Sequence, residues 1–476
     1  MNKNSTDHAG HLSRRQLLQG ATVAGVALPL TQTLLASKAH AQTRMALPEI
    51  QAALPSFSLA ERNRRWAAVR ANMAEPQWDL DAIITCFSDE WGSDARYLTQ
   101  VAKVRYSGGG PQVIFPRDPA KTVSVQMGGA RHRDEWIGRL NDGGDWLADG
   151  KMEILAEYRA EDMATRLAAE GYDRLGTRIG VSALRGTQFE ADGLVSEGWM
   201  DTLRSALPAA EFVPIDRWGQ DSGPIISAAM VKAPEEQAMI RHAVASNEAG
   251  LAAMVEVAGD GATRQDQLWW AAFATMFANN GEDFNRLSIA LDEGGNATLA
   301  EPVVDPISMG QHCNQEINSA YQGYSCQINH SFFIGSPSMP GYDYYSAAIE
   351  VMSEIHESCM AFIVPGETTY ADLMDHLVAL YREEHDIEGG FYALHSGGIS
   401  RGLSRPRGGP GFRDSEIVIQ PGHSFDWKPS TILNRARIRD VGEQNRSVQL
   451  GESYLVTENG VERYGNRPLS PIATHA

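Results

Sequence analysis

Cysteine, basic charge and long hydrophobic segments are all scarce in this sequence. Four cysteines in 476 residues are too few for a small fold held together by disulfides. Lysine and arginine number 41 against 60 aspartates and glutamates, a net charge of −19. This balance argues against nucleic acid as a partner, because phosphate binding needs a basic surface. What remains is an ordinary globular composition, 43% hydrophobic and 21% charged, with enough length for two domains.

The first forty residues have the features of an export signal. Residues 13–18 contain a twin-arginine motif, an apolar stretch follows over 21–35, and 39–41 offer an Ala-x-Ala cleavage site. A membrane helix is the alternative, but Pro29 interrupts the stretch, which is shorter than the roughly 20 residues that a span requires. We therefore predict a twin-arginine signal peptide over 1–41 and a mature protein that is periplasmic or exported, with no membrane span.

From about residue 50 the sequence alternates between strand and helix patterns. Strands are predicted at 81–87, 112–116 and 121–126, and helices at 57–73, 159–170 and 188–207. Such alternation is typical of an α/β domain. Glycine and proline cluster over 217–234, which marks a boundary. We therefore predict an N-terminal domain over 50–228.

A second domain opens with a helix. In Lys232-Ala233-Pro234-Glu235-Glu236, proline suits the first helical position and the glutamates suit the positive end of the helix dipole. Further helices are predicted at 263–279, 341–362 and 368–385, and strands after 284 and over 390–463. Helices packed on an antiparallel sheet make an α+β domain, which we place at 229–470.

Several separate motifs follow one another in this second domain, at 232–236, 323–324 with 331–335, 364–368, 420–425 and 455–460. In this order they resemble the pita-bread family, whose members include Xaa-Pro aminopeptidases, prolidases, methionine aminopeptidases and creatinase. Upstream, 96–99 and 113–116 resemble the creatinase-type N-terminal domain. The resemblance implies an α+β fold in which a pita-bread domain, a curved antiparallel sheet with helices, follows a creatinase-type α/β domain.

The metallopeptidases of that family bind two metal ions through two aspartates, a histidine and two glutamates. In order, these positions correspond to Glu316, Gln327, His395, Lys428, and Gly451 or its neighbour Glu452. Gln327 is a poor anchor for a cation, and the ammonium of Lys428 would repel a dication by several kcal/mol at short range. The resemblance therefore implies the family fold with a dismantled metal site, and we expect no metal and no cofactor.

Two alignments stay open. A shift within the strand gives Asp426 the role of the missing glutamate, and we treat that alternative as incompatible with the Lys428 alignment because a one-residue shift reverses the face. In addition, 397–399 match the family's glycine-histidine-glycine turn equally well, which leaves His395 two residues out of place.

Creatinase, which works without metal, makes a metal-independent hydrolase acting on a C–N bond of a small molecule our leading hypothesis. The alternatives are a lyase on the same scaffold, a metal-dependent Xaa-Pro aminopeptidase, and a non-catalytic binding protein with the retained fold. The resemblance also implies a homodimer. The predicted catalytic residues are His395, Lys428 and Glu316. The predicted substrate-binding residues are Gln327, Glu301, Asp426, Glu452, Arg401 and Arg405.

Other reactive side chains have simpler interpretations. Strand alternation sends His330 to the face opposite Gln327, which favours a structural histidine, and His423 in a strand-entry turn is similar. Cys313 and Cys326 lie close in sequence on paired strands, where a disulfide can form in an oxidising compartment.

Overall fold

The computed structural model describes residues 55–85, 94–101, 111–126, 144–155, 159–184, 195–215, 223–280, 286–292, 304–385, 393–396, 416–430 and 448–475. These residues all fall within one compact unit, Pro55–Ala476. The predicted signal peptide lies outside them. None of the helices in the described part is long and apolar enough to cross a membrane.

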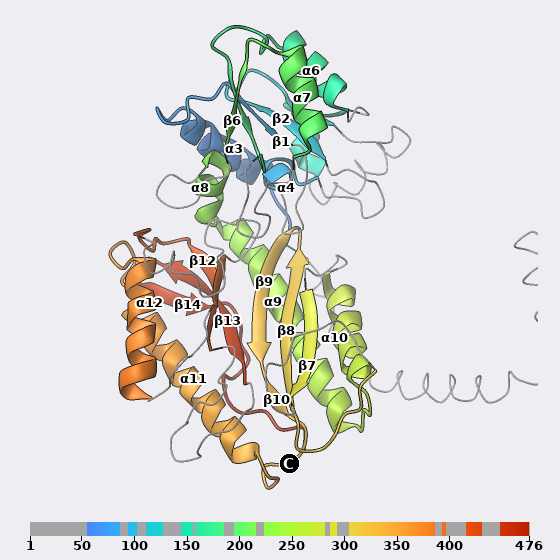
Figure 1. Ribbon diagram of the computed structural model, residues 1–476, viewed down its shortest axis with the longest axis vertical. Coiled ribbons are helices and arrows are strands. Elements are labelled where there is room, and N and C mark those ends of the chain that lie inside the picture. The colour runs from blue at the N-terminus through green and yellow to red at the C-terminus, as the bar shows by residue number, and fades with distance from the viewer. Residues whose placement is uncertain are drawn as a thin grey trace, which may run out of the picture. The chain divides into compact units, whose positions relative to one another are not determined.

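The first half of the described chain forms a six-stranded mixed sheet (Figure 1). Its order is β4 (Met152–Leu155), β3 (Val123–Gln126), β2 (Gln112–Pro116), β1 (Ala82–Thr85), β5 (Arg178–Val181) and β6 (Glu211–Pro214). The β1–β2 and β2–β3 pairs are antiparallel, and the other pairs are parallel. Strands that alternate with helices produce this α/β arrangement, as the sequence predicts.

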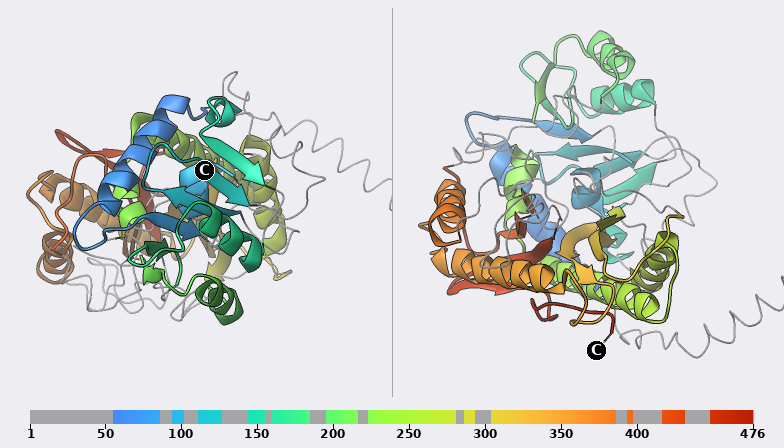
Figure 2. Two further views of the ribbon diagram at one scale, coloured as in Figure 1. Left: turned by 90° about the horizontal axis from the view of Figure 1, so that it is seen from above. Right: turned by 60° about the horizontal axis from the view of Figure 1, so that its bottom comes forward.

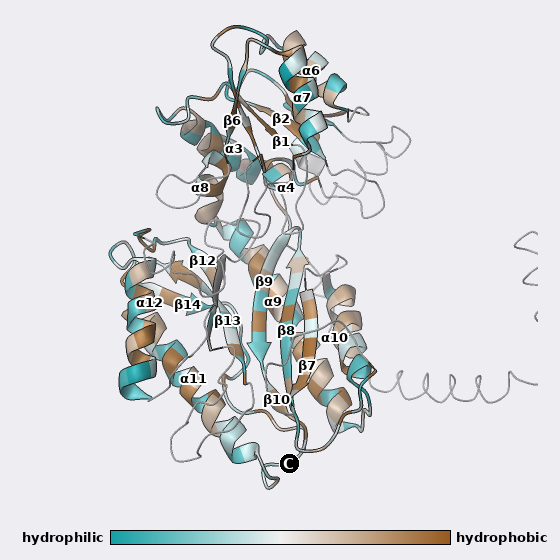
Figure 3. Cartoon of the chain, in the orientation of Figure 1, coloured by the Kyte–Doolittle hydropathy of each residue, from teal (hydrophilic) through white to brown (hydrophobic). Residues whose placement is uncertain are grey.

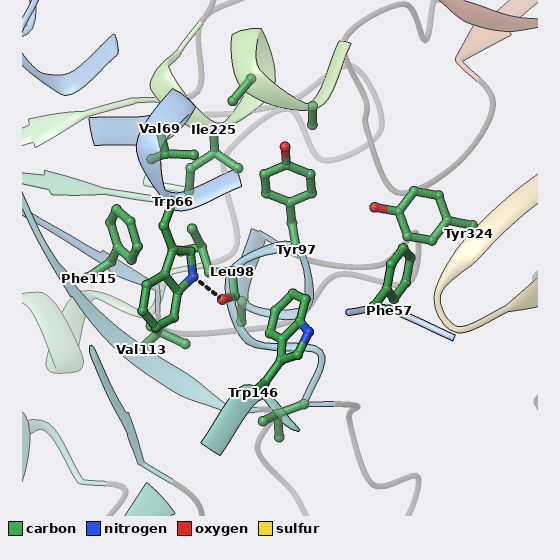
Figure 4. Packing of buried hydrophobic residues seen from close by; sticks show 14 of the residues in the cluster. Phe57, Trp66, Val69, Tyr97, Leu98, Val113, Phe115, Trp146, Ile225 and Tyr324 are labelled. Carbon is green, nitrogen blue, oxygen red and sulfur yellow. Dashed lines mark hydrogen bonds between the residues drawn. The ribbon is translucent and has the colours of Figure 1, made fainter. Parts of the chain in front are cut away.

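The helices of this half are α3 (Leu59–Met73), α4 (Asp94–Thr99), α6 (Ala160–Ala169), α7 (Glu197–Ala206) and α8 (Pro224–Met230), with a short 3-10 turn at Gly144–Leu147. Helix α3 begins after Ser58, whose hydroxyl accepts a hydrogen bond from the Glu61 main chain at 3.1 Å. Trp66 of α3 lies in the hydrophobic core, and its indole N–H donates a hydrogen bond to the Leu98 carbonyl at 2.7 Å (Figure 4).

The second half forms an eight-stranded sheet in which every strand pair is antiparallel. The main path runs β10 (Phe332–Phe333), β8 (His312–Tyr321), β9 (Tyr324–His330), β13 (Leu450–Thr457), β12 (Ser424–Ser430) and β11 (Ala393–Ser396). The strand β7 (Arg286–Asp292) pairs with β8, and β14 (Gly460–Arg463) pairs with β13. Gln322 and Gly323 join β8 to β9 with positive φ angles of 51° and 81°, the geometry of a tight hairpin turn.

Among the described residues of this half, the helices are α9 (Pro234–Gly259), α10 (Gln265–Asn280), α11 (Tyr342–Phe362) and α12 (Tyr370–Ala379), the last continued by a π turn at Leu380–Glu384. Helix α9 begins at Pro234, and the Glu236 carboxylate accepts a hydrogen bond from the Ala233 main chain at 2.8 Å. In the right-hand view of Figure 2, α9 (green) and α11 (orange) run along one side of the strands.

The two faces of the second sheet differ in chemistry. One face is apolar and packs against α9 and α10 through Ile317 and Ile328, and against α11 through Phe425 and Trp427. The opposite face carries polar side chains, and bands of teal and brown alternate along β8 and β9 in Figure 3. This is an α+β fold, and the polar face carries four of the predicted site residues, Glu316, Gln327, Asp426 and Lys428.

The start of β9 is held by a buried charged cluster. The Tyr324 hydroxyl donates to Glu236 at 2.7 Å. Arg65 of α3 is fully buried, with its guanidinium 2.8 Å from Glu61 and 4.1 Å from the Phe57 ring centroid. The Arg65 guanidinium also lies over the Tyr324 ring, so these contacts connect α3 and α9 to the start of β9, on the hairpin that carries part of the site.

Candidate functional site

Strand register defines which side chains share the polar face. Asn318 pairs with Gln327, Asn329 with Gly451, and Asp426 with Ser453 in the antiparallel ladders. Residues directly opposite each other project to the same side of a sheet. Alternation along β8 places Glu316 with Asn318, and alternation along β12 places Lys428 with Asp426. The polar face therefore brings together residues from four neighbouring strands.

Glu316, Gln327 and Lys428 meet at the centre of this face. The Lys428 ammonium lies 3.1 Å from Glu316 Oε1, and the Gln327 side-chain amide donates to the same oxygen. All three residues are at most 5% exposed. An ion pair with so little water access keeps much of its Coulomb attraction, so the charge of Lys428 balances that of Glu316.

Gly451 leaves the room that the Lys428 side chain occupies. A Cβ atom at position 451 would lie 2.6 Å from Lys428 Cγ and 2.8 Å from Asn329 Oδ1. Side-chain atoms do not approach that closely, so residue 451 must be glycine while Lys428 keeps this conformation. Between the two residues that the alignment offered, Gly451 is the one on the polar face.

Asp426 is buried on the same face and is held by Ser453. The Ser453 hydroxyl lies 2.5 Å from Asp426 Oδ1 and 3.1 Å from the Gln327 carbonyl oxygen. Burial raises the pKa of Asp426 to about 7. A hydroxyl carries one hydrogen, so both contacts form together when Asp426 is protonated and donates to Ser453 while Ser453 donates to Gln327.

Asp426 and Lys428 were both predicted as site residues, and the structure places both on the polar face. The two residues are two positions apart, and alternation with period two puts both on one face. Lys428 also contributes a favourable Coulomb interaction to the Asp426 carboxylate. The site therefore contains both side chains.

Glu452, expected to bind substrate, belongs to the opposite face. It pairs with Trp427, whose ring lies in the apolar core, and its carboxylate is 2.6 Å from the Arg467 guanidinium. Burial raises its pKa. The inclusion of Glu452 in the site is corrected for this reason: a one-residue step along β13 reverses the face.

His395 lies on β11, where its backbone pairs with Asp426. The side chain of His395 lies outside the described residues, as do Glu301, Arg401, Arg405 and the alternative histidine position at 397–399. The predicted roles of these residues stay predictions. The register at least brings the β11 backbone alongside the strand that carries Asp426 and Lys428.

His330 and His423, for which a structural role was favoured, are both buried and hydrogen-bonded within the fold. His330 Nε2 is 3.0 Å from the Ser470 carbonyl, and Arg467 donates to its Nδ1 at 3.2 Å. His423 Nδ1 is 3.3 Å from the Tyr370 hydroxyl. Burial lowers the pKa of each histidine to about 3, so both are neutral.

The disulfide considered between Cys313 and Cys326 is wrong. Cys326 pairs with Ser319 in the β8–β9 ladder, whereas Cys313 pairs with Phe332, so the two thiols lie at different levels of the sheet. Both are free and buried.

Sequence reasoning missed Ser453 and Arg467. Ser453 was detectable, because it lies two residues from Gly451 and therefore shares its face. Arg467 follows β14 in an irregular segment, and nothing in the local pattern indicates that it returns to Glu452.

The side chains on this face do not suit a pair of cations. Glu316 already holds the Lys428 ammonium, Gln327 offers a neutral amide, and Gly451 offers no side chain. Among the residues that the structure describes, no group of three or more histidine, cysteine, aspartate or glutamate side chains is arranged to hold a metal ion.

Comparison with known proteins finds one matching family and several solved structures of similar fold. Residues 238–458 match Metallopeptidase family M24. The X-Pro aminopeptidase from Thermotoga maritima has a TM-score of 0.61 at 15% identity, covering 85% of this chain and 99% of that one. The prolidase from Pyrococcus horikoshii scores 0.60 at 14% identity, covering 85% and 99%. The N-terminal domain of FACT complex subunit SPT16 from chickpea (Cicer arietinum) scores 0.58 at 12% identity, covering 88% and 100%.

Proposed function

Residues 238–458 form a domain of metallopeptidase family M24, a pita-bread hydrolase scaffold, and from this premise we propose that the protein is a metal-independent hydrolase of creatinase type that acts on a C–N bond of a small molecule. Export through the twin-arginine route, predicted from residues 1–41, is part of the proposal.

One observation carries the proposal: the Lys428 ammonium lies 3.1 Å from Glu316 at positions where the resemblance places metal-binding carboxylates. Lys428 supplies a fixed ammonium donor in a buried site without a metal ion, and the carboxylate of Glu316 balances its charge. A preorganised cation of this kind stabilises negative charge that develops on an oxygen during hydrolysis. Glu316 holds the ammonium in place, and the Gln327 amide holds Glu316.

The proposed reaction assigns proton transfer to His395. The imidazole takes a proton from water, the hydroxide adds to a carbonyl carbon that is bonded to nitrogen, and the electron pair of the C=O π bond moves to the oxygen, where Lys428 stabilises the oxyanion. The C–N bond then breaks, and the proton passes from His395 to the leaving nitrogen. Asp426, with a pKa of about 7, is a buried carboxyl group that binds substrate through its proton or its charge. Gln327, Glu301, Arg401 and Arg405 complete the proposed binding set.

A non-catalytic binding protein is the second candidate, and a specific observation favours it. The ionisable side chains of the site are paired with one another: Lys428 and Gln327 bind Glu316, and Ser453 binds Asp426. Ionisable groups that are paired without a ligand are compatible with a retained scaffold that lost its chemistry, and the buried oxygens of Asn318 and Asn329 on the same face are left for a bound ligand. The chickpea domain of similar fold is named as a subunit of a complex.

A panel of small amides, ureido and guanidino compounds separates the two candidates. For the hydrolase we expect turnover that a metal chelator leaves unchanged and that Lys428→Met and His395→Ala each reduce by at least about 100-fold. The control is Arg264→Met, which breaks a surface ion pair with Asp266. Saturable binding without turnover supports the binding protein, and full turnover in both site variants contradicts the proposed residues.

A further inference from the structure

Two side-chain oxygens on the polar face are buried and accept no hydrogen bond within the described part of the chain. They are Asn318 Oδ1 and Asn329 Oδ1. Asn318 is 3% exposed and Asn329 is 1% exposed. Leaving a buried acceptor without a donor costs free energy, so a pair of such atoms on one face calls for an explanation. The residues assigned to the proposed hydrolysis do not include either asparagine.

The orientation of the Asn329 amide is fixed by its own nitrogen. Nδ2 donates to the Gln315 carbonyl at 2.8 Å and to Gln449 Oε1 at 3.2 Å. Because a main-chain carbonyl only accepts, the atom that faces Gln315 is the nitrogen and the other atom is the oxygen. A Cβ at Gly451 would lie 2.8 Å from this oxygen and 2.6 Å from Lys428 Cγ. The unpaired acceptor therefore lies next to the Lys428 side chain.

The two asparagines occupy diagonal positions of the β8–β9 hairpin. Asn318 pairs with Gln327, and the same register continued by two residues puts Glu316 opposite Asn329. The Gln327 amide bonds to Glu316 along one diagonal, and the two asparagines are the ends of the other. Diagonal neighbours in an antiparallel pair are about 7–8 Å apart. The unpaired oxygens therefore flank the contact between Gln327 and Glu316.

The charges at the centre of the face favour a neutral ligand. The Lys428 ammonium and the Glu316 carboxylate balance each other at 3.1 Å. Asp426 is held by the Ser453 hydroxyl at 2.5 Å, and the protonated, uncharged carboxyl lets Ser453 keep its second hydrogen bond. A cationic ligand at the asparagine oxygens would lie beside Lys428 and be repelled by it. The donors that suit the two oxygens are therefore neutral N–H groups.

The spacing of the two acceptors favours a group with N–H on two nitrogens. With a C–N bond of about 1.33 Å and an N–H···O distance of about 2.9 Å, the two nitrogens of a planar ureido group reach acceptors about 7 Å apart. The single nitrogen of a simple amide reaches acceptors only about 5 Å apart. The ureido oxygen lies between the nitrogens and suits the ammonium of Lys428, which has three hydrogens and spends one on Glu316. A guanidinium has both nitrogens, but it is charged and has no oxygen for Lys428.

We propose that the polar face recognises a neutral ureido group, which donates its two N–H groups to Asn318 and Asn329 and accepts a hydrogen bond from the Lys428 ammonium. Asn318 and Asn329 then determine specificity, because they distinguish a ureido group from an amide and from a guanidinium. This inference names the substrate class of the proposed hydrolase and rests on that function.

NMR titration of the full chain with methylurea and with methylguanidinium tests the inference, because the two probes share a shape and differ in charge. We expect methylurea to bind at least about tenfold more tightly, and Asn318→Leu to weaken methylurea binding by about tenfold. Asn318→Asp keeps the shape, adds a negative charge and shifts the preference toward methylguanidinium. The matched control is Asn459→Asp, the same change in an exposed turn, which leaves the preference unchanged. Circular dichroism confirms that the variants are folded.

Binding is measured without turnover, so the inference and the proposed function fail separately. Preferential binding of methylurea without hydrolysis of any ureido compound supports the recognition and contradicts the hydrolase. Hydrolysis of a guanidino compound, together with tighter binding of methylguanidinium, keeps the hydrolase and overturns the inference. Equal affinity for the two probes, binding of neither probe, or methylurea binding that Asn318→Leu leaves unchanged also overturns it.

Discussion

Lys428 Nζ lies 3.1 Å from Glu316 Oε1, and both side chains are 6% exposed. The two residues come from β12 and β8, 112 positions apart in sequence. Removal of one partner leaves the other charge buried without compensation, which costs far more than the pair contributes. The pair therefore governs both the stability and the electrostatics of the polar face.

The first prediction concerns this pair. Lys428→Met lowers the free energy of unfolding by about 3–5 kcal/mol at neutral pH, because Glu316 stays buried and charged. The double variant Lys428→Met with Glu316→Gln recovers most of the loss, since both charges are gone. Urea unfolding of the four proteins in the cycle measures the coupling. Additive losses contradict a direct interaction.

The second prediction concerns the space beside Lys428. Gly451→Ala places a Cβ 2.6 Å from Lys428 Cγ and lowers the free energy of unfolding by about 1–3 kcal/mol. Gly198→Ala is the control, because a Cβ at that position of α7 meets no atom within 4 Å and alanine favours the helix. A tolerated Gly451→Ala shows that Lys428 does not occupy this space.

The third prediction is a pH dependence from Asp426. Its folded pKa of about 7 exceeds the unfolded value of about 3.9, so the folded state binds the proton more tightly. The protonated Asp426 carboxyl therefore contributes to the free energy of unfolding in full below about pH 4, and this contribution is lost as the pH rises through 7. Between pH 5 and 8 the wild type loses about 1–3 kcal/mol relative to Asp426→Asn, whose amide keeps a donor for Ser453.

Comparison of the two proteins isolates this effect. The buried histidines have lowered pKa values and impose the opposite slope, but they do so equally in wild type and variant. Unfolding curves at several pH values give the difference directly. A difference that is constant from pH 5 to 8 means that the pKa of Asp426 is not raised.

The fourth prediction concerns the thiols. Cys313 and Cys326 stay reduced in the native protein and do not react with a thiol reagent until the chain unfolds, because both are buried and burial raises their pKa. Mass spectrometry of the protein digested without reductant checks this. A Cys313–Cys326 cross-link in native protein contradicts the strand register.

The sequence was sufficient for the fold because its helices have strong local signals. Pro234 with two following glutamates predicts the start of α9, and the helical period predicts the helix over 342–362 almost to the residue. The register of β12 and β13 was not predictable to one residue. That single step decides between Gly451 and Glu452, because side chains alternate between faces.

The site residues could be predicted where the resemblance aligns a polar residue of this chain with a ligand position of the family. Glu316, Gln327 and Lys428 were expected to converge, and the structure brings them together. Ser453 and Arg467 depend on contacts between distant segments, which no local pattern reveals. The catalytic roles assigned to His395, Lys428 and Glu316 stay predictions.

The central claim is that an ammonium has replaced paired metal ions on the polar face. Elemental analysis of the purified protein, after incubation with Mn²⁺, Co²⁺ or Zn²⁺ and dialysis, tests this most directly. The account predicts well below one metal ion per chain, since Lys428 repels a cation beside Glu316. Two tightly held ions per chain would contradict it.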